Sequence, residues 1–145
     1  MRKKTYRFIS LVFIIALLLS FSSFAVYNPP DAPDASAYIS SYSVRIINGG
    51  NGVLKVDFDV TGTGTMSKIG ATSIKIYRSN GNYVTTIWNT DSGRSGMLGS
   101  NTSYHSDTEN YTVTPGSYYV KVVVYAKNSS GYDAITVTTG NKTIT

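Results

Sequence analysis

The chain has few side chains suited to acid–base chemistry, and its single histidine, His105, is the first to consider. It lies in the segment Ser103-Tyr104-His105-Ser106-Asp107, which contains the residue types of a Ser-His-Asp triad. Serine-rich loops bring these types together by composition alone, and the Gly-x-Ser-x-Gly turn that exposes a nucleophilic serine does not occur in the sequence. We therefore predict no catalytic residue, and a hydrolase that uses His105 is the least favoured alternative.

Carboxylates and cysteines, which glycoside hydrolysis or metal binding would require, are also scarce. Glu109 is the only glutamate and there are 0 cysteines, which excludes the usual zinc sites. Asp57 and Asp59 lie two positions apart, with Arg45 and Lys55 near enough to pair with them, as is typical of a solvated strand face. Glycoside hydrolysis needs two placed carboxylates, and calcium needs six or more oxygen ligands. The sequence therefore predicts no metal and no cofactor.

Aromatic side chains are the more promising source of function, since the chain has 12 tyrosines and 1 tryptophan. The predicted strand registers place several of them on the outward face of one sheet, together with Val84 and Val123. Flat aromatic rings stack on sugars and anchor protein partners, and exposed apolar patches often mark interaction sites. The predicted binding face comprises Tyr77, Trp88, Tyr119 and Tyr125, and a loop at its rim contains Ser103, Tyr104 and His105.

The same aromatic pattern could arise in a protein that binds nothing through this face. Tyrosine and threonine make good strand surfaces in any sheet, so their abundance requires no ligand. Alternatively, the long segment 89–107 folds over the face and buries it. Exposure of Trp88 and Tyr125 would argue against such a cover.

The strands that must position these residues follow from a period of two in the sequence. From Tyr38 onward apolar and polar residues alternate, as in 54–60 and 118–126, and no stretch has the 3.6-residue period of a helix. Threonine, valine, tyrosine and serine are abundant where a helix would have leucine, glutamate and alanine. Every second residue therefore enters a shared apolar interior, which should contain Val56, Val122 and Ile135.

Glycine and asparagine mark three hairpin turns, at 48–52, at Asn80-Gly81 and at 128–131. Each turn predicts a register that keeps apolar partners on one face, and a slip by one residue would reverse that face. The predicted pairs are Ile46–Leu54, Val44–Val56 and Tyr42–Phe58 across the first turn, Ile74–Ile87 and Ile76–Thr85 across the second, and Val124–Ile135 and Val122–Val137 across the third.

The remaining connections, 61–71, 89–107 and 114–117, suit crossings between two sheets because they are rich in glycine, serine and threonine. This order of hairpins and crossings along the chain predicts an all-β fold. The expected architecture is a seven-stranded antiparallel sandwich of the fibronectin-III or immunoglobulin-like type, with strands A, B and E facing G, F, C and C′. Pro115-Gly116-Ser117-Tyr118 resembles the start of strand F in that superfamily, which implies that Tyr118 is its tyrosine corner. The core tryptophan is missing, because Trp88 falls on C′, so a jelly roll is the alternative.

The N-terminus has the three-part pattern of a secretory signal peptide, predicted as a helix within residues 1–25. A basic start precedes an apolar run at 8–19, which is shorter than the roughly 20 residues of a membrane span. Cleavage is therefore favoured over a membrane anchor. Residues 26–37, rich in proline, aspartate and alanine, are predicted as a linker, and 38–145 as the sandwich domain.

The net charge of the chain gives no support for nucleic-acid binding. Of the 13 lysines and arginines, four lie in the predicted signal peptide, which leaves nine against 8 acidic residues. Nucleic-acid binding needs a basic patch or stripe on the domain itself. We predict no nucleic-acid partner, and a membrane contact only through the signal peptide if it is not cleaved.

Three segments carry a resemblance to known proteins: YISSYS at 38–43, VTGTGTMSKIGATSI at 60–74 and MLGSNTSYHS at 97–106. They resemble a family of small secreted proteins of Gram-positive, clostridial-type bacteria that carry a domain of unknown function. The second segment is the most specific, and the likeness covers essentially the whole domain. The resemblance implies secretion and a single domain, but it implies no activity and no functional residues.

Together these observations predict a secreted, non-enzymatic binding or adhesion module whose partner is an extracellular glycan or a surface protein. The alternative is a structural envelope or matrix protein that self-associates through its edge strands. The two differ in whether the aromatic face binds a ligand.

Overall fold

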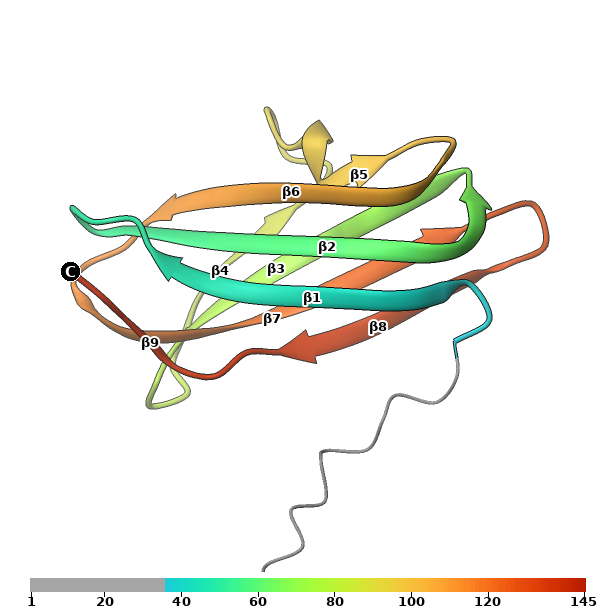
Figure 1. The fold of residues 1–145 in the computed structure, drawn as a ribbon. Helices are drawn as coiled ribbons and strands as arrows, with labels where there is room; N and C mark the ends of the chain where they lie inside the picture. Colours follow the sequence, from blue (N-terminus) through green and yellow to red (C-terminus); the bar gives the residue numbers. More distant parts are fainter. Residues whose placement is uncertain (1–35) are drawn as a thin grey trace, which may run out of the picture. The chain divides into compact units, whose positions relative to one another are not determined.

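The computed structural model describes residues 36–145 and places them in two antiparallel β-sheets (Figure 1). The predicted signal peptide and most of the linker lie outside the described residues. The first sheet has the order β1 (Ile39–Asn48), β2 (Val53–Met66), β6 (Thr102–Thr112). The second has the order β4 (Tyr83–Trp88), β3 (Lys68–Arg78), β7 (Gly116–Lys127), β8 (Tyr132–Thr138), with β5 (Leu98–Gly99) on β3 and β9 (Lys142–Ile144) on β7.

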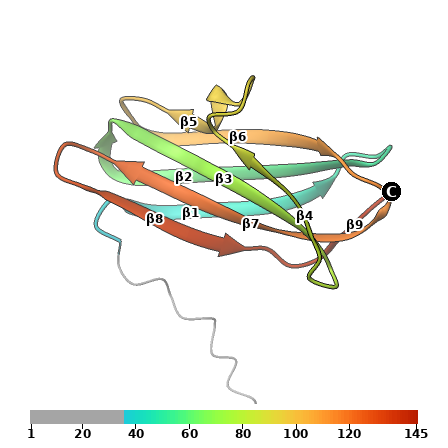
Figure 2. The ribbon, with the colours of Figure 1, turned by 180° about the vertical axis from the view of Figure 1, so that it is seen from behind.

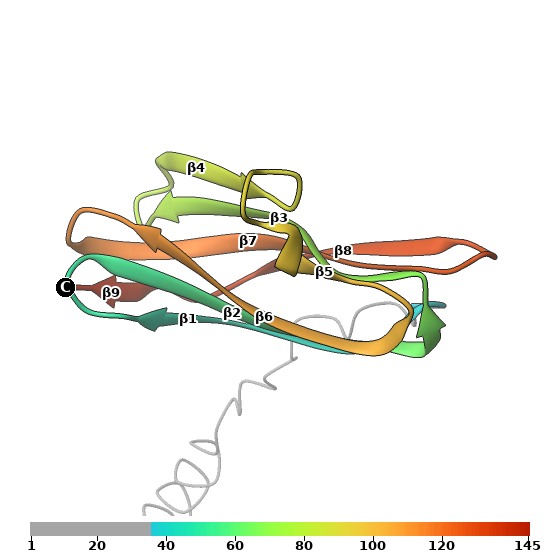
Figure 3. The ribbon, with the colours of Figure 1, turned by 90° about the horizontal axis from the view of Figure 1, so that it is seen from above.

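The sheets pack face to face in two layers with an apolar core between them (Figure 3). Val56 and Val122 are fully buried, and Ile135 is half-buried against the core. The alternation of buried and less buried residues along β2 and β7 is the period of two seen in the sequence. The predicted all-β antiparallel sandwich and its inward face are therefore confirmed. With 0 cysteines, apolar burial is the main favourable contribution to folding.

Two of the three predicted hairpin registers are confirmed. Their turns are short and contain glycine or asparagine where the chain reverses. Between β7 and β8 the length of the turn sets the register, whereas between β3 and β4 the predicted pairs lie beyond a register shift between Ile76 and Tyr77. The observed pairs are Ile74–Ile87 and Ile76–Thr85 between β3 and β4, and Val124–Ile135 and Val122–Val137 between β7 and β8.

The predicted register between β1 and β2 is wrong by two residues. The backbone N–H of Gly49 donates to the carbonyl oxygen of Val53 (2.8 Å), so only residues 50–52 form the turn. All three have positive φ angles (77°, 51° and 74°), which glycine and asparagine tolerate. Because the shift is even, every side chain stays on its predicted face. The observed pairs are Ile46–Val56, Val44–Phe58, Tyr42–Val60 and Arg45–Asp57, the last of which is also an ion pair.

Of two segments predicted as long crossing loops, 61–71 is largely strand and 89–107 is partly strand. Within 61–71, Ser67 alone separates β2 from β3, and within 89–107 the second half forms β5 and the start of β6. The ends of β2 and β3 gain backbone partners in β6 and β5, and this pairing outweighs the low strand propensity of glycine. Residues 36–145 therefore contain nine strands instead of the predicted seven, of which β5 and β9 are the short additions.

Tyr118 lies near the start of β7, just after the crossing from β6, and its ring is buried in the core. Its hydroxyl donates a hydrogen bond to the carbonyl oxygen of Thr114 (2.6 Å). Arg78 lies over the same ring, 5.5 Å from its centroid, and donates to the hydroxyl of Thr114 (2.8 Å). The buried phenol is therefore satisfied by the backbone upstream of its own strand.

A clasp at the start of the described chain connects the approach to β1 with β8 of the other sheet. The carboxylate of Asp133 accepts hydrogen bonds from the hydroxyl of Ser36 and from the backbone N–H of Tyr38 (2.6 Å). The bond from Ser36, followed by that from Tyr38, lowers the pKa of Asp133 below 3.8. Residues 36 and 37, predicted as the end of the linker, thus contact the domain, since Thr63 also bonds the carbonyl of Ala37.

This clasp predicts a pH dependence of stability. Because the folded state lowers the pKa of Asp133, its contribution is present above the ordinary value of 3.8 and is lost as the pH falls through the folded-state pKa. We expect Asp133→Asn to lower the urea midpoint at pH 7 and to differ little from the parent protein near pH 2. Ser36→Ala should reduce the same difference, because it removes one donor. Equal differences at both pH values would contradict the prediction.

Candidate binding face

Figure 2 shows the second sheet from its outward side, with strands β4, β3, β7 and β8 next to one another. The outward side chains of these strands form rows that run across the sheet. The pairing registers determine which residues share a row. We call the first row the tyrosine row and the second the lysine row. In order along β3, the rows are Tyr83–Tyr77–Tyr119, then Thr86–Lys75–Lys121–Thr138, then Trp88–Ser73–Val123–Thr136, and last Tyr125–Ala134.

The tyrosine row is a continuous aromatic surface across three strands. The rings of Tyr77 and Tyr119 stack with their centroids 5.2 Å apart and an interplanar angle of 8°. Tyr83 meets Tyr77 edge-on at 5.8 Å and is 59 % exposed. Aromatic pairs in these two arrangements attract one another beyond their apolar burial, so the row is held in place before any ligand arrives.

A β-bulge explains why Tyr83 belongs to this row. The hairpin register, continued without interruption, places Val84 opposite Tyr77. The register shifts between Ile76 and Tyr77, so that Tyr83 pairs with Tyr77 instead. Bulges redirect side chains in this way, and the sequence carried no signal for this one.

The lysine row lies directly beside the tyrosine row. Lys75 and Lys121 are paired opposite each other on neighbouring strands. The ammonium of Lys121 lies 5.6 Å from the centroid of Tyr77, within the range of a cation–π contact. The lysines were not among the predicted binding residues, although both fall on outward positions of the predicted strands.

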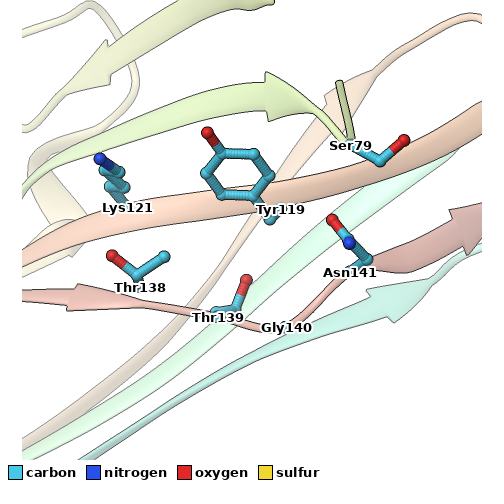
Figure 4. Close-up of a pocket in the computed structure, with 7 residues that line it drawn as sticks. All are labelled: Ser79, Tyr119, Lys121, Thr138, Thr139, Gly140 and Asn141. Carbon is cyan, nitrogen blue, oxygen red and sulfur yellow. The ribbon is translucent and has the colours of Figure 1, made fainter. Parts of the chain in front are cut away.

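A shallow hollow of about 410 Å³ opens next to Tyr119, between β7 and the segment that joins β8 to β9 (Figure 4). One side presents the phenol ring of Tyr119 and the ammonium of Lys121. The other presents hydroxyl and amide groups. The hollow is lined by Ser79, Tyr119, Lys121, Thr138, Thr139, Gly140 and Asn141. A flat ring beside several hydrogen-bonding groups is a surface that suits a polyhydroxylated ligand.

The four aromatic residues predicted to form the binding face share the outward face but do not form one cluster. Tyr77 and Tyr119 stack in the tyrosine row. Trp88 is 48 % exposed and lies beyond the lysine row. Tyr125 is half-buried and packs at 5.7 Å against Tyr132, at the far end of the sheet. The segment 89–107 therefore leaves much of Trp88 uncovered, although Asp91 of this segment accepts a hydrogen bond from the Trp88 backbone (2.7 Å).

The prediction of a rim loop at Ser103, Tyr104 and His105 is wrong, because these residues lie in β6 of the other sheet. Tyr104 pairs with Thr61 and His105 with Val60, so the segment is held as strand by β2. Tyr104 points outward there and is 52 % exposed.

Every second residue of β6 instead points toward the interior, where polar groups seal the edge of the sandwich. His105 bonds the carbonyl oxygen of Gly96 through Nε2 (2.7 Å), and its ring lies 6.4 Å from that of Phe58. Glu109 is buried and forms an ion pair with Arg94. Burial raises the pKa of Glu109 above 4.5, against the attraction of Arg94. Inward charges of this kind protect an exposed edge strand from pairing with other chains.

Metal-binding clusters and membrane-spanning helices do not occur in the described part of the chain. Within residues 36–145, no group of three or more histidine, cysteine or acidic side chains is placed to hold a metal ion. Over the same residues, no helix has the length and apolar character needed to cross a membrane.

Comparison with known proteins adds little to this picture. No protein-family model and no curated protein sequence matches the chain. A solved structure that resembles it is the "Putative ApaA Protein" from Bordetella pertussis, with 11% sequence identity and a TM-score of 0.43. The superposition covers 72% of this chain and 89% of that chain. At this level of similarity the likeness supports no conclusion about function.

Proposed function

We propose that this chain is a secreted, non-enzymatic module that binds an extracellular glycan through the outward face of its second sheet. The observation that carries the proposal is the tyrosine row, which presents stacked rings beside a hollow lined by hydroxyl and amide groups. Sugar rings have apolar faces that stack on aromatic side chains and hydroxyls that bond polar neighbours. A protein partner would be anchored by the same rings, but the hollow's polar lining favours the glycan.

We also propose that the domain belongs to the fibronectin-III or immunoglobulin-like type of sandwich. The seven longer strands pair in the orders β1-β2-β6 and β4-β3-β7-β8, which supports strands A, B and E facing C′, C, F and G. The bond from Tyr118 to the Thr114 backbone supports a tyrosine corner at that position. The proposed secretion, and the kinship with small secreted clostridial proteins, depend on the sequence patterns alone.

The proposal predicts that the tyrosine row is required for binding. Tyr119→Ala removes the ring that both stacks on Tyr77 and lines the hollow. Truncating an aromatic anchor typically costs about 2 kcal/mol of binding free energy, so we expect affinity to fall about 30-fold. The measurement is a glycan array, followed by titration calorimetry with the best ligand.

The matched control is Tyr104→Ala, which removes an exposed tyrosine from the other sheet and should leave affinity unchanged. Circular dichroism of each variant establishes that it is folded. If no glycan binds the parent protein, or if Tyr119→Ala binds as well as Tyr104→Ala, the proposed site is wrong.

A further inference from the structure

The lysine row pairs two like charges on neighbouring strands, and an anionic ligand would relieve their repulsion. Lys75 and Lys121 are directly opposite each other, where Cβ atoms on neighbouring antiparallel strands lie about 5 Å apart. Like charges in this position repel and destabilise the sheet. The other residues of the row, Thr86 and Thr138, are neutral, so the row itself holds no counter-charge.

The acidic residues within 36–145 lie outside the lysine row. Four of them, Asp57, Asp59, Asp107 and Glu109, belong to strands of the first sheet, and Asp91 accepts a hydrogen bond from the Trp88 backbone. The two ion pairs among residues 36–145 are Arg45–Asp57, in the first sheet, and Arg94–Glu109, at the β6 edge. Asp133 accepts the hydrogen bond from Ser36 in the clasp. The residues on either side of it in β8, Tyr132 and Ala134, are exposed, whereas Asp133 itself is only partly exposed. None of the outward positions in the four rows is a carboxylate. The tyrosine and lysine rows are therefore cationic as well as aromatic.

The position of these charges relative to the rings indicates how a ligand would use them. Lys121 lines the hollow together with Tyr119, and it also lies over the ring of Tyr77. Successive residues on one face of a strand are about 7 Å apart, so a negative group carried by a sugar stacked on the tyrosine row reaches the lysine row. A neutral sugar would leave the two lysines of this pair without a counter-charge.

We infer that the ligand of this face is an anionic glycan, whose sugar rings stack on the tyrosine row and whose carboxylate or phosphate groups lie between Lys75 and Lys121. This inference rests on the proposed glycan binding and adds the charge of the ligand to it. The supporting observations are the direct opposition of the lysines, the lack of a carboxylate on the outward face, and the shared lining of the hollow.

The test uses three probes of matched length: an oligogalacturonate, a polyol-phosphate oligomer and a neutral galacto-oligosaccharide. Carboxylate and phosphate sources of the charge are thereby separated. We expect at least one anionic probe to bind at least tenfold more tightly than the neutral one, with affinity that decreases as salt is added. The double substitution Lys75→Gln with Lys121→Gln should remove this preference.

Two control variants test whether the position of the charge matters. Lys75→Arg with Lys121→Arg keeps the charge and should retain the preference for the anionic probe. Lys55→Gln removes a cation from β2 of the other sheet and should have no effect. Because the double glutamine variant relieves a repulsion, it should be at least as stable to urea as the parent protein.

The outcomes separate this inference from the proposed function. If Tyr119→Ala abolishes binding while the double glutamine variant binds all probes like the parent protein, the glycan site stands and its anionic character is refuted. Equal or stronger binding of the neutral probe by the parent protein also refutes it. Failure of every probe to bind would overturn both proposals.

Discussion

Phe58→Ala should destabilise the domain by about 3–5 kcal/mol, which is a large part of the total stability of a typical domain. Phe58 lies on β2, the central strand of the first sheet, and only 1% of it is exposed. Removing its ring loses the transfer free energy of the buried atoms and leaves a cavity that the two facing sheets cannot fully close. The chain has no cysteine and hence no disulfide, so its total stability depends on burial of this kind.

Urea denaturation followed by tryptophan fluorescence measures the effect. Phe58→Leu keeps most of the volume and should cost less than about 1.5 kcal/mol. Tyr104→Ala removes a ring of similar size from an exposed position and should change the free energy of unfolding by less than about 0.5 kcal/mol. A loss below about 1 kcal/mol in Phe58→Ala would mean that the core is not packed as described.

Gly70→Ala should destabilise the domain by about 2–4 kcal/mol and release β5 from the sheet. Gly70 has a φ angle of 141°, which side chains rarely adopt. A Cβ atom there would collide with the carbonyl oxygen of Met97 and lie 2.8 Å from Cδ2 of His105. Both neighbours are fixed, since Met97 is buried and His105 bonds the Gly96 carbonyl.

The matched control is Gly64→Ala, because a Cβ at that glycine would meet nothing within 4 Å. We expect this control to change stability by less than about 0.5 kcal/mol. Hydrogen exchange measured by mass spectrometry should show faster exchange at 95–99 in Gly70→Ala alone. Unchanged exchange and stability would show that the backbone at Gly70 can relax without cost.

The predictions from sequence succeeded where a local rule decides the outcome. The period of two assigned Val56 and Val122 to the interior without knowledge of their partners. The turn at 128–131 has a length that fixes the register, and its register was predicted. The pairs predicted across Asn80-Gly81 are also observed, beyond a register shift between Ile76 and Tyr77 that the sequence did not indicate. The turn at 48–52 contains three glycines, and several closures are compatible with it. Its register was therefore missed by two residues.

The sequence predicted only some of the residues of the candidate site. Tyr77 and Tyr119 were assigned to the outward face by alternation, and they stack there. Tyr83 joined them because a bulge shifts β4, and a bulge depends on the strain and pairing of the whole sheet. The segment at 139–141 lines the hollow because β9 returns to β7, which no local pattern indicated.

Local sequence patterns were sufficient to predict that the chain is all-β, which side chains point inward, and where two of its three hairpins turn. Those features depend on neighbouring residues, whose steric and apolar preferences act over a few positions. Contacts between distant segments make 102–107 and all of 61–71 except Ser67 strand. They also place His105 at the edge of the sandwich instead of in the site, and they pair the two lysines beside the stacked tyrosines. These outcomes required partners distant in sequence, because backbone pairing and side-chain contacts between sheets outweigh weak local propensities.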